Sequence, residues 1–176
     1  MIETERLILR DPVSGDRPAL HAMWADPLVM AELGPVKDAA GSDAVLAKHA
    51  GFRHEGLGFR TVARRADGAV VGFCGLKRGD AHTPIAGEVE AGWLIDRPYW
   101  RQGYAQEAMR AALAWGWANT DAARIVAITA AINGKSRALM EKLGMERLAD
   151  GDFLHALFAE DDPRRLTVTY AIARPA

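Results

Sequence analysis

Residues 93–108, WLIDRPYWRQGYAQEA, combine the residue types of a phosphate-binding site. An apolar strand is expected to run into a loop that contains Gly103 and then to open directly into a helix. The first N–H groups of a helix have no partner within it and lie at the positive end of the helix dipole, where anions bind. Gly103 and the small Ala105 would leave room for a pyrophosphate against the first turn. A simple tight turn is the other interpretation of the same pattern.

The remaining reactive side chains do not form a recognisable site. Cys74 is the only cysteine, so an internal disulfide is excluded, and nothing in the sequence positions a histidine beside it to activate the thiol. We therefore expect Cys74 to be a small buried hydrophobic residue. The sequence predicts no metal site, because it has no CxxC pair and its histidines lack ligand spacing. The histidines considered are His21, His49, His54 and His82.

The composition limits the class of protein. The 176 residues are enough for one domain with a real core, and we expect a single domain over residues 1–176. The composition, 49% hydrophobic and 26% charged, is typical of a soluble globular domain. Lys and Arg number 22 against 23 Asp and Glu, which argues against a nucleic-acid partner. The charged N-terminus lacks a signal-peptide core and no long apolar run occurs, so we expect no membrane partner and a cytoplasmic protein.

Hydrophobic periodicity and turn residues predict the elements that surround the loop. Asp67 and Gly68 are typical of a hairpin turn, and Gly144 is expected to end a helix. The predicted strands are residues 6–10, 59–65, 69–77, 88–95, 124–130, a short one from 145, and 166–173. The predicted helices start at Ser14 or Asp16, after Pro27, at Ser42 or Asp43 (ending near 54), at 104 (ending near 118) and at 133 (ending at 143). These elements describe an α/β protein with a mixed sheet and helices on both faces.

Several segments together resemble the GNAT acyltransferases, which transfer an acetyl group from acetyl-CoA to an amine. In order and spacing they are most similar to the RimJ/RimL-like branch, the ribosomal-protein alanine/serine N-acetyltransferases. The segments are TERLILR at 4–10, DPLVMAELG at 26–34, EVEAGWLID at 88–96, WRQGYAQEA at 100–108 and NGKSRALMEKLGM at 133–145. The resemblance covers almost the whole chain and implies a GNAT-like fold with a mixed, largely antiparallel sheet.

The resemblance also implies acetyl-CoA as the cofactor, with CoA as a product. Backbone N–H groups of the loop would hold the phosphates, and the end of the preceding strand would pair with the pantetheine arm. The family pattern has Gln or Arg where this chain has Trp100, whereas Gly103 and Ala105 fit it. Lys135 and Arg137 either reach a phosphate or are solvated. The implied cofactor-binding residues are Trp93, Leu94, Ile95, Arg101, Gln102, Gly103, Tyr104, Ala105, Gln106, Asn133 and Ser136.

Acetyl transfer to an amine needs a proton acceptor and an acid that helps the thiolate to leave. Many members of the superfamily carry a tyrosine as the acid where this chain has Met140, which cannot donate a proton. In the RimL-like branch a serine at the position of Ser136 has this role; the alternative is a serine that bonds the local backbone. Glu90 is the candidate base or amine-binding residue. Glu88 shares its strand face and is expected to be exposed.

The resemblance therefore implies an acetyl-CoA-dependent N-acetyltransferase. Its acceptor would be a primary amine of a small molecule or a protein N-terminus, attacking the thioester directly. A non-catalytic CoA-binding sensor or an interaction module on the same fold is the alternative, because Met140 and Trp100 depart from the family pattern. Asp152 and His155 lie in a loop that either lines the acceptor site or is a plain surface loop. The sequence leaves the acceptor, and a homodimer, open.

Overall fold

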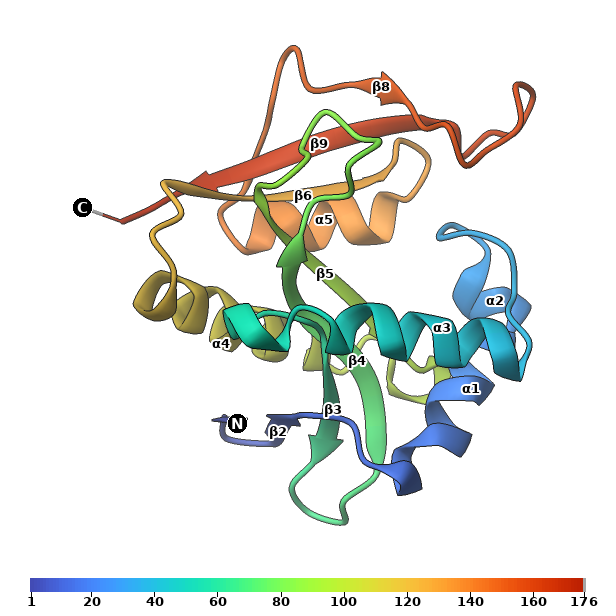
Figure 1. Cartoon of the computed structure of the whole chain (residues 1–176), viewed down its shortest axis with the longest axis vertical. Helices are drawn as coiled ribbons and strands as arrows, with labels where there is room; N and C mark the ends of the chain where they lie inside the picture. The colour runs from blue at the N-terminus through green and yellow to red at the C-terminus, as the bar shows by residue number, and fades with distance from the viewer. Residues whose placement is uncertain (176) are drawn as a thin grey trace.

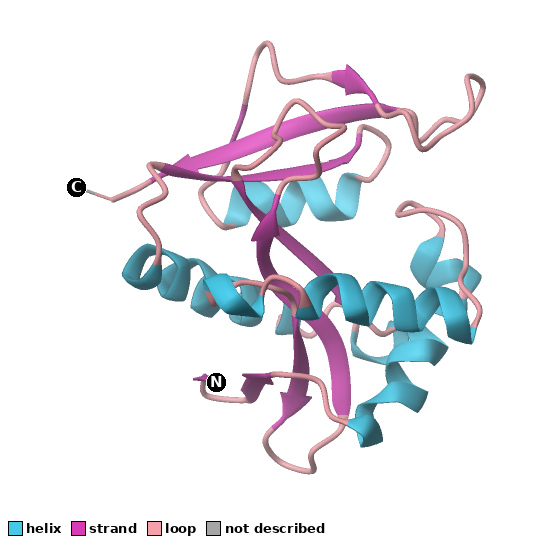
Figure 2. Cartoon of the chain, viewed as in Figure 1, coloured by secondary structure: helices cyan, strands magenta, loops and turns pink. Residues whose placement is uncertain are grey.

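A twisted sheet runs through the molecule, as Figures 1 and 2 show. The computed structural model describes residues 1–175. Within them the strand order is β1-β2-β3-β4-β5-β6-β9-β7, with β8 paired to β9. Neighbouring strands are antiparallel except for β5 and β6. The strands are β1 (Ile2–Glu3), β2 (Leu7–Arg10), β3 (Arg60–Arg64), β4 (Val70–Arg78), β5 (Val89–Ile95), β6 (Arg124–Ala130), β7 (Glu146–Arg147), β8 (Phe153–Leu154) and β9 (Leu166–Ala173).

Helices cover both faces of this sheet, and in Figure 1 α3 crosses in front of the strands while α4 lies behind them. The helices are α1 (Arg17–Ala25), α2 (Pro27–Met30), α3 (Ala39–Ala50), α4 (Tyr104–Asn119) and α5 (Gly134–Lys142). Short 3-10 helices occur at Ser14–Asp16, Arg53–Glu55 and Arg97–Tyr99. The predicted α/β fold, a mixed and largely antiparallel sheet with helices on both faces, is confirmed. None of the helices in residues 1–175 has the length and apolar character needed to cross a membrane.

Each face of the sheet has its own hydrophobic core. Apolar side chains of α4 and α5, such as Met109 and Met140, pack on one face. Those of α1 and α2 pack on the other face, against Phe73 and Leu94. Cys74 lies in the first core with no exposed surface, and burial raises the pKa of its thiol to about 12. The prediction that Cys74 is a buried hydrophobic residue is therefore confirmed.

The pairing of β5 with β6 is unusually short. The strands are parallel because α4 connects them as a crossover. They share only two residue pairs, Val89 with Ile125 and Glu90 with Val126, and then diverge. The Asp96 N–H donates to the Val71 carbonyl at 3.0 Å, on the β4 side. Since backbone groups alternate along a strand, the N–H and C=O of Trp93 face the opposite side, where β6 has moved away.

Most predicted boundaries hold, and the exceptions have local causes. The prediction that Ser42 or Asp43 begins α3 is wrong: the helix starts at Ala39, because the Asp38 carboxylate accepts a 2.7 Å hydrogen bond from the Gly41 N–H and caps it. Strands β1 and β8, of two residues each, were not predicted. Such short strands are specified by their partners in the sheet rather than by their own residue pattern.

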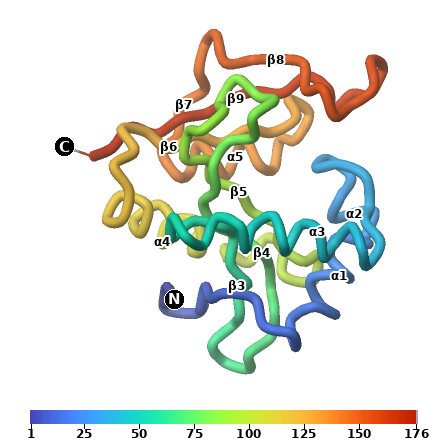
Figure 3. The backbone as a smooth tube through the Cα atoms, viewed as in Figure 1, coloured from blue at the N-terminus to red at the C-terminus, as the bar shows by residue number. Residues whose placement is uncertain are grey.

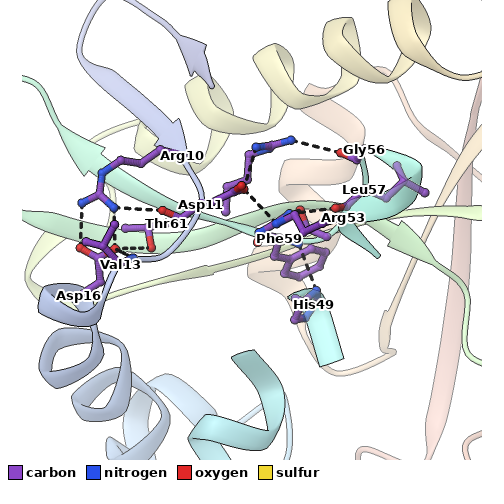
Figure 4. A network of polar contacts seen from close by, with 12 residues as sticks. Arg10, Asp11, Val13, Asp16, His49, Arg53, Gly56, Leu57, Phe59 and Thr61 are labelled. Carbon is purple, nitrogen blue, oxygen red and sulfur yellow. Dashed lines mark hydrogen bonds and ion pairs between the residues drawn. The ribbon is translucent and has the colours of Figure 1, made fainter. Parts of the chain in front are cut away.

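A polar network ties the helical layer to the sheet (Figure 4). The buried Asp16 carboxylate accepts hydrogen bonds from the Arg10 guanidinium at 2.6 and 2.8 Å and from the Thr61 hydroxyl at 2.9 Å. Partial burial acts to raise the pKa of Asp16, but these bonds hold it below its ordinary value. The Arg53 guanidinium donates to the carbonyls of Leu57, Gly58 and Phe59, which fixes the turn that enters β3.

Candidate functional site

A cavity of about 630 Å³ lies where β5 has separated from β6. Its walls come from α2 and the turn after it, the end of β5, the loop that starts α4, and α5. The residues that line it are Leu28, Val29, Glu32, Leu33, Trp93, Leu94, Ile95, Tyr99, Trp100, Arg101, Gly103, Tyr104, Ala105, Gln106, Asn133, Lys135, Ser136, Ala138, Leu139 and Lys142. The backbone trace in Figure 3 shows the α2 region close to the start of α5, where Glu32 and Lys135 form an ion pair of 3.7 Å.

The loop before α4 has a conformation that leaves backbone donors free. Gly103 is the N-cap residue of α4 and has φ = 82°, in the left-handed region that glycine adopts easily. Among residues 1–175, Arg101 is the one residue other than glycine with a positive φ, at 60°. The first backbone bond of the helix runs from the Glu107 N–H to the Gly103 carbonyl at 3.0 Å. The N–H groups of the preceding residues in the first turn thus have no acceptor within the helix.

The charge of the cavity wall suits an anionic ligand. Arg101, Lys135 and Lys142 contribute three positive side chains against the single carboxylate of Glu32. The Lys135 ammonium also lies 4.8 Å from the centroid of the Trp100 ring, within the range of a cation–π interaction. Free N–H groups at a helix N-terminus and nearby cations are the features that bind phosphate groups in proteins.

Trp100 closes the base of the loop. Its indole Nε1–H donates to the Ile95 carbonyl at 2.7 Å, which fixes the end of β5 against the loop. Its ring also packs against both hydrophobic cores. Trp100, which stands where the GNAT pattern has Gln or Arg, therefore forms part of the cavity wall.

Asn133 and Ser136 form the far wall. Asn133 is only 3% exposed, and its Oδ1 caps α5 by accepting a 3.0 Å hydrogen bond from the Ser136 N–H. The cap uses only the side-chain oxygen of Asn133, so its amide N–H groups take no part in capping. Among the described residues, the Ser136 hydroxyl has no hydrogen-bond partner. A hydroxyl donor thus lies free at the cavity wall.

Glu90 lies beside the point of divergence but does not line the cavity. It is 8% exposed and directly opposite Lys77 on β4, with which it forms a short ion pair. Burial raises the pKa of the Glu90 carboxyl, and the charge of Lys77 opposes that rise. Lys77 also lies 3.4 Å from Asp80, which pairs with Lys48. Glu90 is thus a buried carboxylate that already has a cation.

The structure brings the predicted cofactor residues together, with the exception of Gln102. The Gln102 side-chain amide donates to the Pro98 carbonyl at 2.8 Å, and the Gln102 backbone carbonyl accepts from the Arg6 guanidinium. Lys135 lines the cavity, whereas the Arg137 guanidinium donates to the Ala131 carbonyl and to Tyr170.

Three further candidates, Glu88, Asp152 and His155, lie outside the cavity wall, and the expectation that Glu88 is exposed is wrong because it pairs with Arg124. Glu88 is half-buried and paired with Arg124, and Asp152 is paired with Arg147. Burial lowers the pKa of the half-buried His155, which does not line the cavity.

Sequence reasoning missed the contribution of the α2 region to the cavity. Leu28, Val29, Glu32 and Leu33 line one wall. They lie in the segment DPLVMAELG, in which the sequence predicted a helix after Pro27 but no part of the site. No local sequence pattern indicated this wall, because a single exposed apolar residue such as Leu28, which is 55% exposed, is common on protein surfaces.

Comparisons with known proteins agree with this geometry. The family model described as "Acetyltransferase (GNAT) domain" matches residues 6–146. The uncharacterized N-acetyltransferase YoaA of Bacillus subtilis is 25% identical over 178 residues, covering 99% of this chain and 97% of that protein. A GNAT-family acetyltransferase from Bacillus anthracis has a TM-score of 0.79 and 26% identity, with 98% of each chain covered.

Two solved structures of more distant proteins contain CoA. Spermidine N-acetyltransferase from Vibrio cholerae, in complex with CoA and spermine, has a TM-score of 0.74 and 18% identity, with 97% of each chain covered. RimL, a ribosomal L7/L12 alpha-N-protein acetyltransferase in complex with coenzyme A, has a TM-score of 0.74 and 18% identity, covering 97% of this chain and 95% of that one. At these identities the likeness is one of fold.

The Lys77–Glu90 pair yields a stability prediction. Lys77→Met should destabilise the protein by about 3 kcal/mol at pH 7, because a buried carboxylate would lose its cation. The double variant Lys77→Met/Glu90→Met should be less destabilised than Lys77→Met alone, because no uncompensated charge remains. Urea unfolding of the wild type, of Lys77→Met, of Glu90→Met and of the double variant measures the four free energies of unfolding. A double variant with the summed loss of the two single variants would show that the pair is not coupled.

Proposed function

The chain belongs to the GNAT acetyltransferase family, and from that premise we propose that it transfers the acetyl group of acetyl-CoA to a primary amine. The observation that carries this proposal is the convergence on one cavity of an unpaired strand edge, a helix N-terminus with free N–H groups, and positive side chains. A thioester on a long polar arm that ends in phosphates has matching chemistry at each of these three places. The two CoA complexes of the same fold support the proposal.

The cofactor-binding roles follow from the cavity wall. The N–H groups of the loop and first helical turn, from Arg101 to Gln106, would hold the pyrophosphate. The outward backbone groups of Trp93 would pair with the amides of the pantetheine arm, as a further strand would. Asn133, through its free amide, would orient the end of the arm. Acetyl-CoA, when bound, supplies the acetyl group as an activated thioester.

The chain's own proton chemistry would be divided between two residues. We assign Glu90 as the proton acceptor, working through water because it lies beside the cavity rather than in its wall. Its burial favours that role, since a raised pKa brings a carboxyl closer to the working pH. We assign the Ser136 hydroxyl as the donor that helps the sulfur leave. Its freedom from other partners favours this role.

A non-catalytic CoA-binding protein is the second candidate. The position that holds an acidic tyrosine in many relatives is Met140, which is 1% exposed and lies in the core, so it supplies no proton. In addition, Glu90 is held by Lys77. Consumption of the thioester in the presence of an amine separates the two candidates.

The finer identity belongs to this proposal as well. We infer a RimJ/RimL-like branch from the segment pattern, with a protein N-terminus or a small molecule such as a polyamine as the acceptor. We further propose a cytoplasmic enzyme, since the one cysteine is buried and reduced, and no nucleic-acid partner. We also propose a homodimer as the assembly.

Acetyl-CoA should stabilise the wild-type protein, by about 2.7 kcal/mol at a hundred times its Kd. Gly103→Glu should abolish that stabilisation, because it places a negative side chain among the phosphate donors. Gly68→Glu is the matched control: Gly68 also has a positive φ, at 74°, but lies on the exposed hairpin turn, so its variant should keep the stabilisation. Melting temperatures with and without acetyl-CoA measure both. If acetyl-CoA raises the melting temperature of Gly103→Glu as it does that of the wild type, the assignment of the loop to the phosphates is wrong.

Ser136→Ala should lower kcat by at least about tenfold while the KM for acetyl-CoA stays within a few-fold, because a leaving-group acid acts mainly in the transition state. Steady-state kinetics with the best amine acceptor checks this split. The opposite split, an unchanged kcat with a raised KM, would make Ser136 a cofactor contact only.

The pH dependence tests Glu90. Glu90→Gln should lower the rate by about 10²- to 10⁴-fold, most strongly at low pH, where the amine is protonated. Lys77→Met removes the cation that favours the ionised carboxyl, so it should raise the pKa of Glu90 and move the acidic limb of kcat/KM to higher pH. Profiles of kcat/KM against pH, measured for the folded variants from about pH 5 to about pH 9, show both effects. This range covers the titration of a carboxyl whose pKa is raised. If neither variant changes the acidic limb, Glu90 is only the partner of Lys77.

A further inference from the structure

The segment Thr4–Arg10 (TERLILR) packs against the start of α4. Its first residues do not line the cavity, yet they contact the first turn of α4 from outside it. The Glu107 Oε1 atom accepts from the Thr4 hydroxyl at 2.6 Å and from the Arg6 N–H at 2.8 Å. The N-terminal segment is therefore attached to the helix whose start forms the proposed phosphate loop.

Arg6 connects this attachment to the loop itself. Its guanidinium donates through Nη1 to the Gln102 carbonyl at 3.0 Å and through Nε to the Glu107 Oε2 at 2.6 Å. It also lies over the Tyr104 ring, 4.6 Å from the centroid. Three partners thus set both the position and the plane of the guanidinium.

The contact with Gln102 orients a donor on the opposite side of the loop. Residues 1–175 contain no cis peptide bond, so the C=O of Gln102 and the N–H of Gly103 belong to one planar trans peptide and point in opposite directions. Arg6 holds the carbonyl on the outside, and its Nη2 lies 3.3 Å from where a Gly103 side chain would begin. Gly103 lines the cavity and Arg6 does not. The Gly103 N–H is therefore directed toward the cavity.

Glu107 keeps Arg6 in this arrangement. Partial burial acts to raise the pKa of Glu107, but hydrogen bonds from Thr4 and Arg6 hold it below its ordinary value. The carboxylate is thus ionised at neutral pH and remains a bidentate partner for the segment.

We propose that Arg6 is a positioning residue that orients the Gly103 N–H toward the phosphates of acetyl-CoA from behind the loop. This inference rests on the proposed function, because it needs a cofactor with phosphates in the cavity. It also assigns a role to Thr4 and Glu107, which hold Arg6 in place. Since Arg6 does not line the cavity and would act through the Gly103 N–H, its effect should depend on whether the cofactor has phosphates.

The test compares acetyl-CoA with S-acetylpantetheine, which has the thioester and the arm but lacks the phosphates. Arg6→Met keeps the length of the side chain and removes its donors. It should raise the Kd and KM for acetyl-CoA about tenfold or more, because the hydrogen bond from the Gly103 N–H to a charged phosphate would be lost. The KM for S-acetylpantetheine should stay within about twofold of the wild-type value. Glu107→Gln, which keeps the shape of the partner, should act in the same direction with a smaller effect.

Arg65→Met is the matched control. The Arg65 guanidinium donates to the Thr4 carbonyl at 2.8 Å, so this variant removes an equal charge from a residue that holds the same segment without touching the loop. It should change neither substrate's KM. All variants are compared at a temperature below their melting transitions, measured without ligand.

The outcomes are distinct. A loss confined to acetyl-CoA supports the positioning role. An equal loss for both substrates, or the same loss in Arg65→Met, would overturn it in favour of a structural or a general charge effect. If Arg6→Met binds acetyl-CoA as tightly as the wild type does, this inference is wrong while the proposed function stands. A wild type that does not bind acetyl-CoA removes the proposed function, and this inference with it.

Discussion

The separation of β5 from β6 after Glu90 is the constraint on which the rest of the site depends. A strand inside a sheet normally has both edges paired, and unpaired backbone groups in the interior are costly. Here the two parallel strands share only two residue pairs, so the edge of β5 beyond Glu90 is left without a neighbour. The cavity occupies the space that a continued β6 would fill. A polar, extended ligand would satisfy the hydrogen bonds of this edge as a further strand would.

The same separation explains why so many elements meet at this place. The chain leaves β5 at Ile95, turns through the loop into α4, and returns in β6, whose end leads into α5 at Asn133. Residues at the starts of both helices line the cavity. Because the starts of helices present free N–H groups, the crossover that makes β5 and β6 parallel also supplies donors for an anion.

Much of the fold could be predicted because the pattern of single segments determines it. The strands Arg124–Ala130 and Leu166–Ala173 have the predicted bounds, and Gly144, with φ = 83°, ends α5 as expected. Asp38 was missed as the cap of α3 because several polar residues stand nearby and only one of them has the right geometry.

The site could be predicted in part. The residues of the loop and of the first turn of α4 that line the cavity could be predicted because they form one continuous segment of the sequence. Three other features depend on contacts between segments that are distant in sequence, and no local pattern reports such contacts. The first is the opposition of Lys77 and Glu90, which the register of β4 and β5 sets. The others are the cavity wall from α2 and the contact of Arg6 with Gln102.

Trp100 has a consequence for the thermodynamics of binding. Its ring belongs to the packing of both cores, and its N–H holds the end of β5. A surface loop usually opens locally at little cost, but this one cannot open without disturbing the side chains on both faces of the sheet. Its conformation is therefore already ordered before a ligand arrives. Association then loses little conformational entropy in the protein, and more of the contact energy is expressed as affinity.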